Sequence, residues 1–390
     1  MKRILRRIIY SLIIISLFLI SGCWDSKEVE SLAITTLITW DLVNENGIDR
    51  WQVGTRILRV PGKKDGGKSE AEETLVKGTG ITIQEAFQDL AKRLPSNIFY
   101  QHTQALIVGE RVAQEELDHL ITQIIRYPGN RLRNHILISR GEAFQAIKAQ
   151  PELLSLLSRE VRLLSENSAE YTGTSERITF KDFTMRILKE DQDSLLPEIK
   201  IYKAQEDEEI SSPSVVIEGF GVFRKSKLVG WLNPNESLGY LLLTKNNKQC
   251  EIPITVNYQE NIIFSYYLIS HSSQITSELI DGVPKFTIKV NTKGMIHETT
   301  GPILKPEELE KLELAAAKRI EEIVWETVNK SFDYQSDFLR LNENLHRWHL
   351  SDWREIEDDW RERFQDAEIE IRVEANVQNF GVVTESIELH

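Results

Sequence analysis

Cys23 is the residue best placed for chemistry, and it is one of only two cysteines in a chain of 390 residues. An apolar run of 13 residues (8–20) precedes it, and Ser21 and Gly22 lead directly to its thiol. Four cations stand before this run: Lys2, Arg3, Arg6 and Arg7. A basic segment, a short apolar core and small residues form the pattern of a secretory signal, and the run is shorter than the ~20 residues of a spanning helix. We expect residues 1–22 to direct export and to be removed.

The stretch "LISGC" resembles the bacterial lipobox, with Ile20 where leucine is commoner. The resemblance implies transfer of a diacylglyceryl group to the sulfur of Cys23 and cleavage between Gly22 and Cys23, with N-acylation of the new amino terminus as a further step. Two acyl chains hold a protein stably on a bilayer where one does not, at about 0.8 kcal/mol per buried CH₂. The alternatives are an uncleaved signal anchor and a plainly secreted protein. No other cofactor is expected.

Net charge limits the choice of partners. The chain carries −13, and loss of the four N-terminal cations would leave −17. Nucleic acid and anionic lipid repel such a body, and no basic stripe interleaved with aromatics offsets the charge. We therefore exclude nucleic-acid binding, and a membrane role requires an anchor stronger than surface charge.

The remaining reactive side chains predict neither a catalytic set nor a metal site. Cys250 is interpreted as a small half-buried residue beside a strand. His346 and His349 could share a helix face, but no third ligand lies nearby, so we expect surface histidines beside a packing Trp348. His102 is either a ligand contact or, as we favour, a satisfied buried histidine. The glycine-rich stretches at 62–68 and 78–80 lack the context of phosphate loops and are interpreted as turns.

The first folded region alternates strands and helices. Residues 32–42 and 50–60 indicate two strands joined by a hairpin turn at Asn46-Gly47. Thr82 and Glu85 suggest a capping box at the start of a helix. Residues 104–109 and 134–139 indicate short strands, and 110–127 and 142–150 indicate helices. This order predicts an α/β layer over 23–203, followed by an acidic linker over 204–213.

The second half of the chain indicates two further units. Residues 215–232 indicate a β-meander, and "NESLGYLLLT" and "EIPITVNY" are interpreted as its continuation in a small β-rich middle domain over 214–258. Within 259–390, a long helix follows Pro306, and 369–377 alternate apolar and polar residues as a half-buried antiparallel strand does. The overall prediction is an α+β or mixed α/β protein of three domains. Its mixed sheets are flanked by helices, and its C-terminal antiparallel sheet carries a long helix.

Two groups of residues could contact a partner. Trp353, Ile356, Trp360 and Phe364 follow helical spacing, and they either dock a partner helix or, as we favour, pack on their own sheet. The second group follows the predicted anchor directly and is either a partner contact or a simple tether: Trp24, Asp25 and Glu28.

Four stretches resemble the Ger(x)C lipoproteins, the C subunits of germinant receptors in spores of Bacillus-type bacteria. They are "GCWDSKEVESLAI", the block from "GTGITIQEAF" to "ALIVGERVA", "IEGFGVFRKSKLVGWLNPNESLGYLLL" and "WREIEDDWRERFQDAEIEIRVEANVQNFG". The chain departs from the family pattern at Trp40, where a small residue is commoner, and after Asp337, where glycines are commoner.

The resemblance implies three domains and a lipid anchor on the outer face of the spore's inner membrane. It also implies assembly with integral membrane A and B subunits into a receptor for small nutrients, with no enzymatic role. The runner-up is a substrate-binding lipoprotein of an importer, which would show two matched α/β lobes around a cleft. A lipid-anchored hydrolase is the third hypothesis, and it would need a clustered nucleophile and base.

Overall fold

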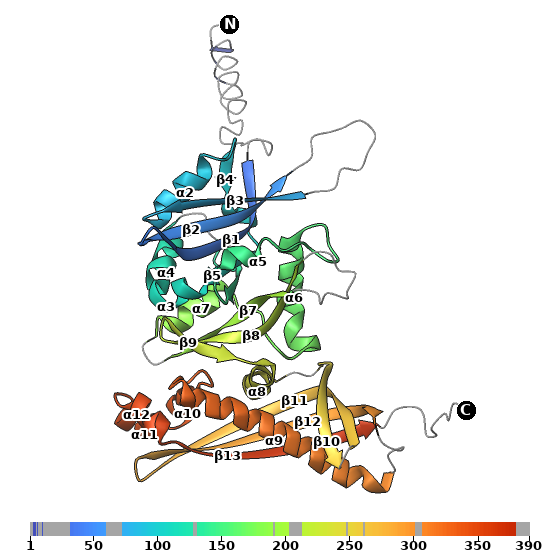
Figure 1. Ribbon diagram of the computed structural model, residues 1–390. Coiled ribbons are helices and arrows are strands. Elements are labelled where there is room, and N and C mark those ends of the chain that lie inside the picture. The colour runs from blue at the N-terminus through green and yellow to red at the C-terminus, as the bar shows by residue number, and fades with distance from the viewer. Residues whose placement is uncertain are drawn as a thin grey trace, which may run out of the picture.

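The structure is a computed structural model with two β-sheets at opposite ends of the molecule, joined through helices (Figure 1). It describes residues 3–4, 6, 10, 32–59, 72–127, 131–189, 192–202, 213–246, 249–259, 262–300 and 306–379. The overall class is α+β with mixed sheets, as predicted.

Nine of the described strands form the first sheet. Their order is β3-β2-β1-β5-β6-β7-β8-β9, and β4 pairs with the start of β1. The strands are β1 (Leu32–Glu45), β2 (Ile48–Arg59), β3 (Glu72–Gly80), β4 (Asn97–Phe99), β5 (Ala105–Gly109), β6 (His135–Ser139), β7 (Ser194–Tyr202), β8 (Ser214–Arg224) and β9 (Lys227–Leu232). The centre, from β1 through β5 and β6 to β7, is parallel, and antiparallel strands continue on both sides.

Helices cover both faces of this sheet. One face packs against α2, α3, α4 and α7, and the other against α5 and α6. The helices are α2 (Ile83–Ala91), α3 (Glu110–Glu115), α4 (Leu117–Arg126), α5 (Ala143–Ala146), α6 (Leu157–Tyr171) and α7 (Phe180–Ile187), with a 3₁₀ turn η2 at Tyr100–His102. Strands buried on both faces have continuous apolar runs, and β5 and β6 are buried at every position.

Four described strands form the second sheet, in the order β10-β11-β12-β13. They are β10 (Ile252–Gln259), β11 (Ile262–Ile280), β12 (Val283–Thr299) and β13 (Glu368–Asn379). The long helix α9 (Leu309–Asp333), after the 3₁₀ turn η3 (Pro306–Glu308), crosses this sheet (Figure 1). Three short helices follow it: α10 (Leu341–Trp348), α11 (Leu350–Ile356) and α12 (Trp360–Gln365).

The helix α8 (Pro234–Thr244) joins the two sheets and corrects a prediction. We expected "NESLGYLLLT" to continue a β-rich unit, but Asn233 and Glu236 form a complete capping box and Pro234 stands at the first turn. Because α8 lies between the first sheet and α9, its residues are buried nearly all round. The run therefore lacks the period that distinguishes a helix from a buried strand.

The sheet topology does not match the three-domain division. Strands β8 and β9 complete the first sheet, whereas β10 opens the second, so residues 214–258 are divided between them. Residues 203–212, which contain nearly all of the predicted linker, lie outside the described residues, but they connect β7 and β8, which are neighbours in one sheet. The described strands therefore form two sheet-based units, and the division into three domains stays a prediction.

The last strand was predicted in the wrong direction. Strand β13 alternates buried and exposed residues as expected, but it pairs parallel with β12, from Lys285–Glu368 onward. The long stretch with α9 supplies the crossover that parallel neighbours require. Alternation reports burial of one face only, which this sheet has because α9 covers a single face, and it carries no information on strand direction.

Several local predictions are confirmed. Asn46 and Gly47 both have positive φ in the β1–β2 turn, as a two-residue hairpin requires. Thr82 caps α2 by accepting from the Glu85 N–H, although the Glu85 carboxylate accepts from Ile81 rather than from the cap residue. The helix expected over 110–127 is divided at Glu116 into α3 and α4.

Candidate functional site

The predicted anchor and contact residues lie outside the described residues: Gly22, Cys23, Trp24, Asp25 and Glu28. The description resumes at Leu32, where β1 pairs with Asn97 of β4. These two strand ends lie at the end of the molecule away from the second sheet (Figure 1). Lipidation of Cys23 therefore stays a prediction.

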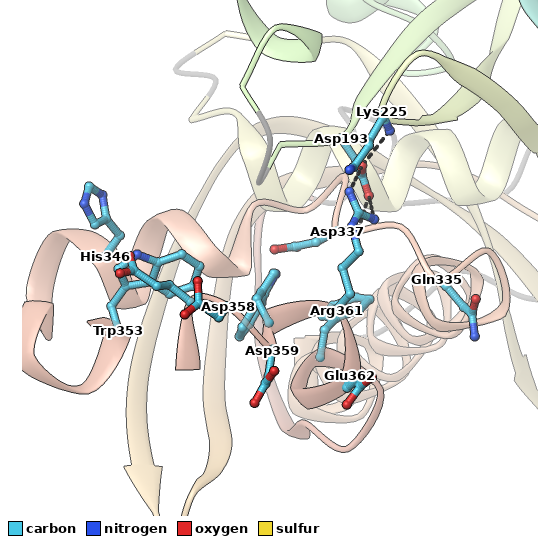
Figure 2. A pocket seen from close by; sticks show the side chains of 13 residues that line it. Asp193, Lys225, Gln335, Asp337, His346, Trp353, Asp358, Asp359, Arg361 and Glu362 are labelled. Carbon is cyan, nitrogen blue, oxygen red and sulfur yellow. Dashed lines mark hydrogen bonds and ion pairs between the residues drawn. The ribbon is translucent and has the colours of Figure 1, made fainter. Parts of the chain in front are cut away.

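The main polar site is the joint between the two sheets, which centres on Asp193 just before β7. Its carboxylate pairs with the Arg361 guanidinium on α12, at 3.1 and 3.5 Å. The Asp193 side chain is 2% exposed, whereas that of Arg361 is 39% exposed. Figure 2 shows Arg361 reaching from the second unit to this acid. Because one partner is solvated, we regard this ion pair as a positioning contact of modest strength.

The same carboxylate holds two backbone segments. Asp193 accepts from the Lys225 N–H at 2.9 Å and from the Asp337 N–H at 3.0 Å. Lys225 forms the β8–β9 turn with φ of 55°, and Asp337 follows α9. One buried acid thus ties the edge of the first sheet to the helices of the second.

Asp337 is a second buried acid at the joint and caps α10. Its two oxygens accept from Leu341 N–H at 2.8 Å and Asn342 N–H at 2.9 Å. Burial, aided by the nearby charge of Asp193, raises the pKa of Asp337 to about 7, although the two N–H donors favour the ionised form. Arg340 enters α10 in the left-handed region at φ 62°, which lets the chain turn back so that both donors reach the acid.

Aromatic side chains line the second-unit side of the joint. Trp353, Ile356, Trp360 and Phe364 are all buried, and the Trp360 ring meets Phe286 of β12 edge-on at 6.4 Å. The row spans α11 and α12 rather than one helix. Packing on their own sheet is confirmed, so these four residues do not offer a surface to a partner helix.

A cavity of about 570 Å³, open to solvent, lies at the joint, and most of the charged side chains that line it are acidic. The described residues lining it include Asp193, Asp337, Asp358 and Asp359, but no serine, threonine or cysteine. Asp193 and Asp337 are engaged by backbone N–H groups, and Asp193 also by a guanidinium. This arrangement can hold two units in register, and it offers no nucleophile paired with a base.

A second contact connects the end of α9 to the edge strand β9 by hydrogen bonds. The Tyr334 hydroxyl donates to the Trp231 carbonyl at 3.0 Å and accepts from its N–H at 3.2 Å. A Cβ at Gly230 would lie 2.2 Å from the Tyr334 ring, so only glycine admits this approach. The Arg140 guanidinium covers the other aromatic, Trp231, at 4.5 Å.

The other singled-out residues have structural roles. Cys250 is buried, and burial raises its pKa to about 11. His102 is exposed beside Phe99, so the favoured buried role was wrong. Trp348 is 70% exposed and does not pack as expected, and His346 instead lies edge-on against Trp353. Within the described ranges, no three His, Cys, Asp or Glu side chains gather to hold a metal ion.

The joint was missed by the sequence analysis because its members are far apart in the chain. Asp193 and Arg361 are separated by 168 positions, and no local spacing connects them, although Arg361 lies within the helically spaced aromatic row. Of its two buried acids, only Asp337 had been noted, and the aromatic row was interpreted as packing on its own sheet. Among the residues that the structure describes, no helix is long and apolar enough to cross a bilayer.

Fold and site together define a class: a two-sheet α+β protein whose units are fixed by a buried acidic joint. The chain belongs to the Ger(x)C family of spore germination proteins. A family described as "Spore germination protein N-terminal domain" matches residues 25–201, and one described as "Spore germination B3/ GerAC like, C-terminal" matches 218–381.

Curated relatives agree over the full length. Spore germination protein KC of Bacillus subtilis (strain 168) is 22% identical over 95% of each chain. Spore germination protein B3 of the same strain is 21% identical over 96% of this chain and 98% of its own. GerQC of Bacillus cereus is 24% identical over 95% and 98%. The crystal structure of the GerBC protein has the same fold, with a TM-score of 0.53 at 18% identity over 88% of this chain and 97% of that one.

Proposed function

We infer that this chain is a lipid-anchored, non-enzymatic subunit of a nutrient germinant receptor, needed for nutrient-triggered spore germination. One observation carries the proposal: the family match begins at residue 25, two residues after a cysteine that ends a lipobox-like signal. The relatives named as spore germination proteins match over the same two units. The partners would be integral membrane A and B subunits, on the outer face of the spore's inner membrane.

The proposed mechanism is positional. Eight residues lie between Cys23 and the start of β1 at Leu32, and the nine residue-to-residue steps span about 30 Å at most when fully extended. The β1–β4 end of the first sheet would therefore lie near the bilayer and the second sheet farther out. Anchoring on one leaflet raises the effective concentration of both units for a membrane partner.

The absence of an enzymatic role is supported by the chemistry of the joint. The most deeply buried acids there, Asp193 and Asp337, hold backbone and guanidinium groups together, so neither is left to act as a general base. The hydrolase hypothesis needs a nucleophile beside such a base, and the joint offers none among its described lining residues.

The importer hypothesis loses its structural basis. A substrate-binding lipoprotein of that class closes two similar lobes on its ligand. Here a large mixed sheet covered on both faces meets a small sheet covered on one. The two units are unlike, so we rank the receptor subunit first.

Fatty-acid labelling tests the anchor. Cells sporulating with labelled palmitate should label the wild-type chain and the Cys250→Ala variant, but not Cys23→Ala. The Cys250 variant is a matched control, because it removes the other thiol, which is buried. Label on Cys23→Ala, or none on the wild type, would contradict the proposal.

A further inference from the structure

A small pocket lies apart from the joint, in the first unit. It lies between α2 and α4 over β1, with a volume of about 100 Å³. Aromatic, aliphatic and amide side chains line it, and none of the described lining residues is charged. A ligand there must therefore be neutral, because an uncompensated ion is costly to bury.

The aromatic walls form a rigid series. Phe87 of α2 meets Tyr100 edge-on at 5.6 Å, and Tyr100 meets Tyr127 edge-on at 5.5 Å. Tyr127 is 50% exposed, so the outer part of the wall faces solvent and gives a path inward. Such walls favour flat or compact apolar bodies.

Trp40 carries a buried hydrogen-bond donor among the lining residues. It stands on β1, lines the pocket and is 4% exposed, yet its indole N–H meets no acceptor among the described residues. A buried donor without an acceptor is unfavourable. The amides of Gln84 and Gln123 are the other hydrogen-bonding groups of the lining besides the tyrosine hydroxyls. The pocket is thus apolar with a few polar groups, as small-molecule sites are.

We propose that this pocket binds a small neutral molecule with an apolar body and a hydrogen-bond acceptor, which accepts from the Trp40 indole N–H. An apolar cavity of about 150 Å³ holds benzene. The volume of about 100 Å³ therefore encloses about four heavy atoms, and a ligand of up to six would extend toward the solvent-exposed side at Tyr127. This inference goes beyond the proposed function and does not depend on it.

Nuclear magnetic resonance of the indole N–H groups tests the site, with cyclopentanone as the probe. The chain from residue 23 with Cys23→Ala keeps every described element from β1 onward, and Trp40→Phe assigns the Trp40 signal by its loss. Cyclopentanone should shift that signal saturably. Cyclopentane, which has the same ring and no acceptor, should bind roughly fivefold more weakly, the loss expected for one neutral hydrogen bond.

The variant completes the comparison. Trp40→Phe keeps an aromatic ring and should weaken cyclopentanone binding to the level of cyclopentane, whereas Trp51→Phe, on the neighbouring strand, should leave both unchanged. The remaining indole signals report whether each variant is folded. Absence of a saturable Trp40 shift in the unaltered chain, or equal binding of the two probes to it, would overturn the proposal.

Discussion

At the scale of single residues, Asp193 and Asp337 show how two acids can be buried side by side. Each is satisfied by backbone N–H groups, and only Asp193 also has a cation, Arg361. The proximity of Asp193 therefore adds to the cost of ionising Asp337. The free energy of unfolding should therefore depend on pH through the carboxyl group of Asp337.

The first prediction concerns this group. Because the folded-state pKa of Asp337 is raised from 3.8 to about 7, the folded protein holds a proton that the unfolded chain has released. The contribution of Asp337 to the free energy of unfolding is therefore greatest below about pH 4 and falls as pH rises to about 7, by at most about 1.4 kcal/mol per pH unit. Asp337→Asn should remove this slope.

Urea unfolding between pH 4.5 and 7.5 measures the effect. Asp41, whose pKa is raised to about 6, acts in the same direction, and His135 and His271, lowered to about 4, act in the opposite one. These groups are present in both proteins, so the difference between wild type and variant isolates Asp337. The free energy of unfolding of the wild type minus that of Asp337→Asn should fall as pH rises. Asp333→Asn, at an exposed position, is the control for the removal of one acid. A difference independent of pH would refute the assignment.

Residues of this joint could not be predicted from the sequence. The carboxylate of Asp193 and the guanidinium of Arg361 meet only because the fold places the start of β7 beside α12. By contrast, Asn46-Gly47 and Thr82 were predictable, since their chemistry acts within four residues. Hydrogen bonds between residues close in the chain can be predicted from the sequence, whereas an ion pair between distant residues cannot.

At the scale of elements, α8 is the piece on which the connection of the two units depends. It packs on α9 through Gly239, where an added Cβ would lie 2.0 Å from the Thr327 hydroxyl oxygen and 2.8 Å from the Ile323 carbonyl oxygen. Thr327 in turn donates to the Glu236 carbonyl of α8 at 2.9 Å. The two helices therefore approach to backbone contact.

The second prediction follows from this contact. Gly239→Ala should raise helix propensity by up to about 1 kcal/mol, but the methyl group has no room, and overpacking costs about 1–3 kcal/mol. We expect a net loss of about 1–2 kcal/mol in the free energy of unfolding. Asn235→Ala, at an exposed position of the same helix, is the control. A stabilised Gly239→Ala protein would show that α8 and α9 pack less closely than described.

The elements that were predicted wrongly share a physical cause. The run in α8 is buried all round, so it has no period, and β13 alternates for reasons of burial that hold for either strand direction. Elements with one buried face, such as α9 and β10, were predictable because their apolar residues recur at 3.6 or 2 positions. Topology depends on contacts between such elements, which periodicity does not encode.

At the scale of the whole molecule, the account predicts an orientation on the membrane. An anchor at Cys23 would place β4 nearer the bilayer than the β11–β12 turn, which belongs to the far sheet (Figure 1). In a Cys250→Ala background, one dye is attached at either Asn97→Cys or Asp281→Cys, both of which are exposed positions. Resonance energy transfer between a dye at the lipid surface and the protein dye is then compared for the two positions. Transfer should be stronger for residue 97, and equal or stronger transfer for residue 281 would contradict this orientation.

Nutrient-triggered germination is the most direct measurement of the central claim. Spores lacking this chain, in a strain without other members of the family, would be complemented with the wild-type chain, Cys23→Ala or Cys250→Ala. The account predicts that the wild type and Cys250→Ala restore the response to at least one nutrient, and that Cys23→Ala fails although the chain is synthesised. Full germination to every nutrient without the chain would contradict it.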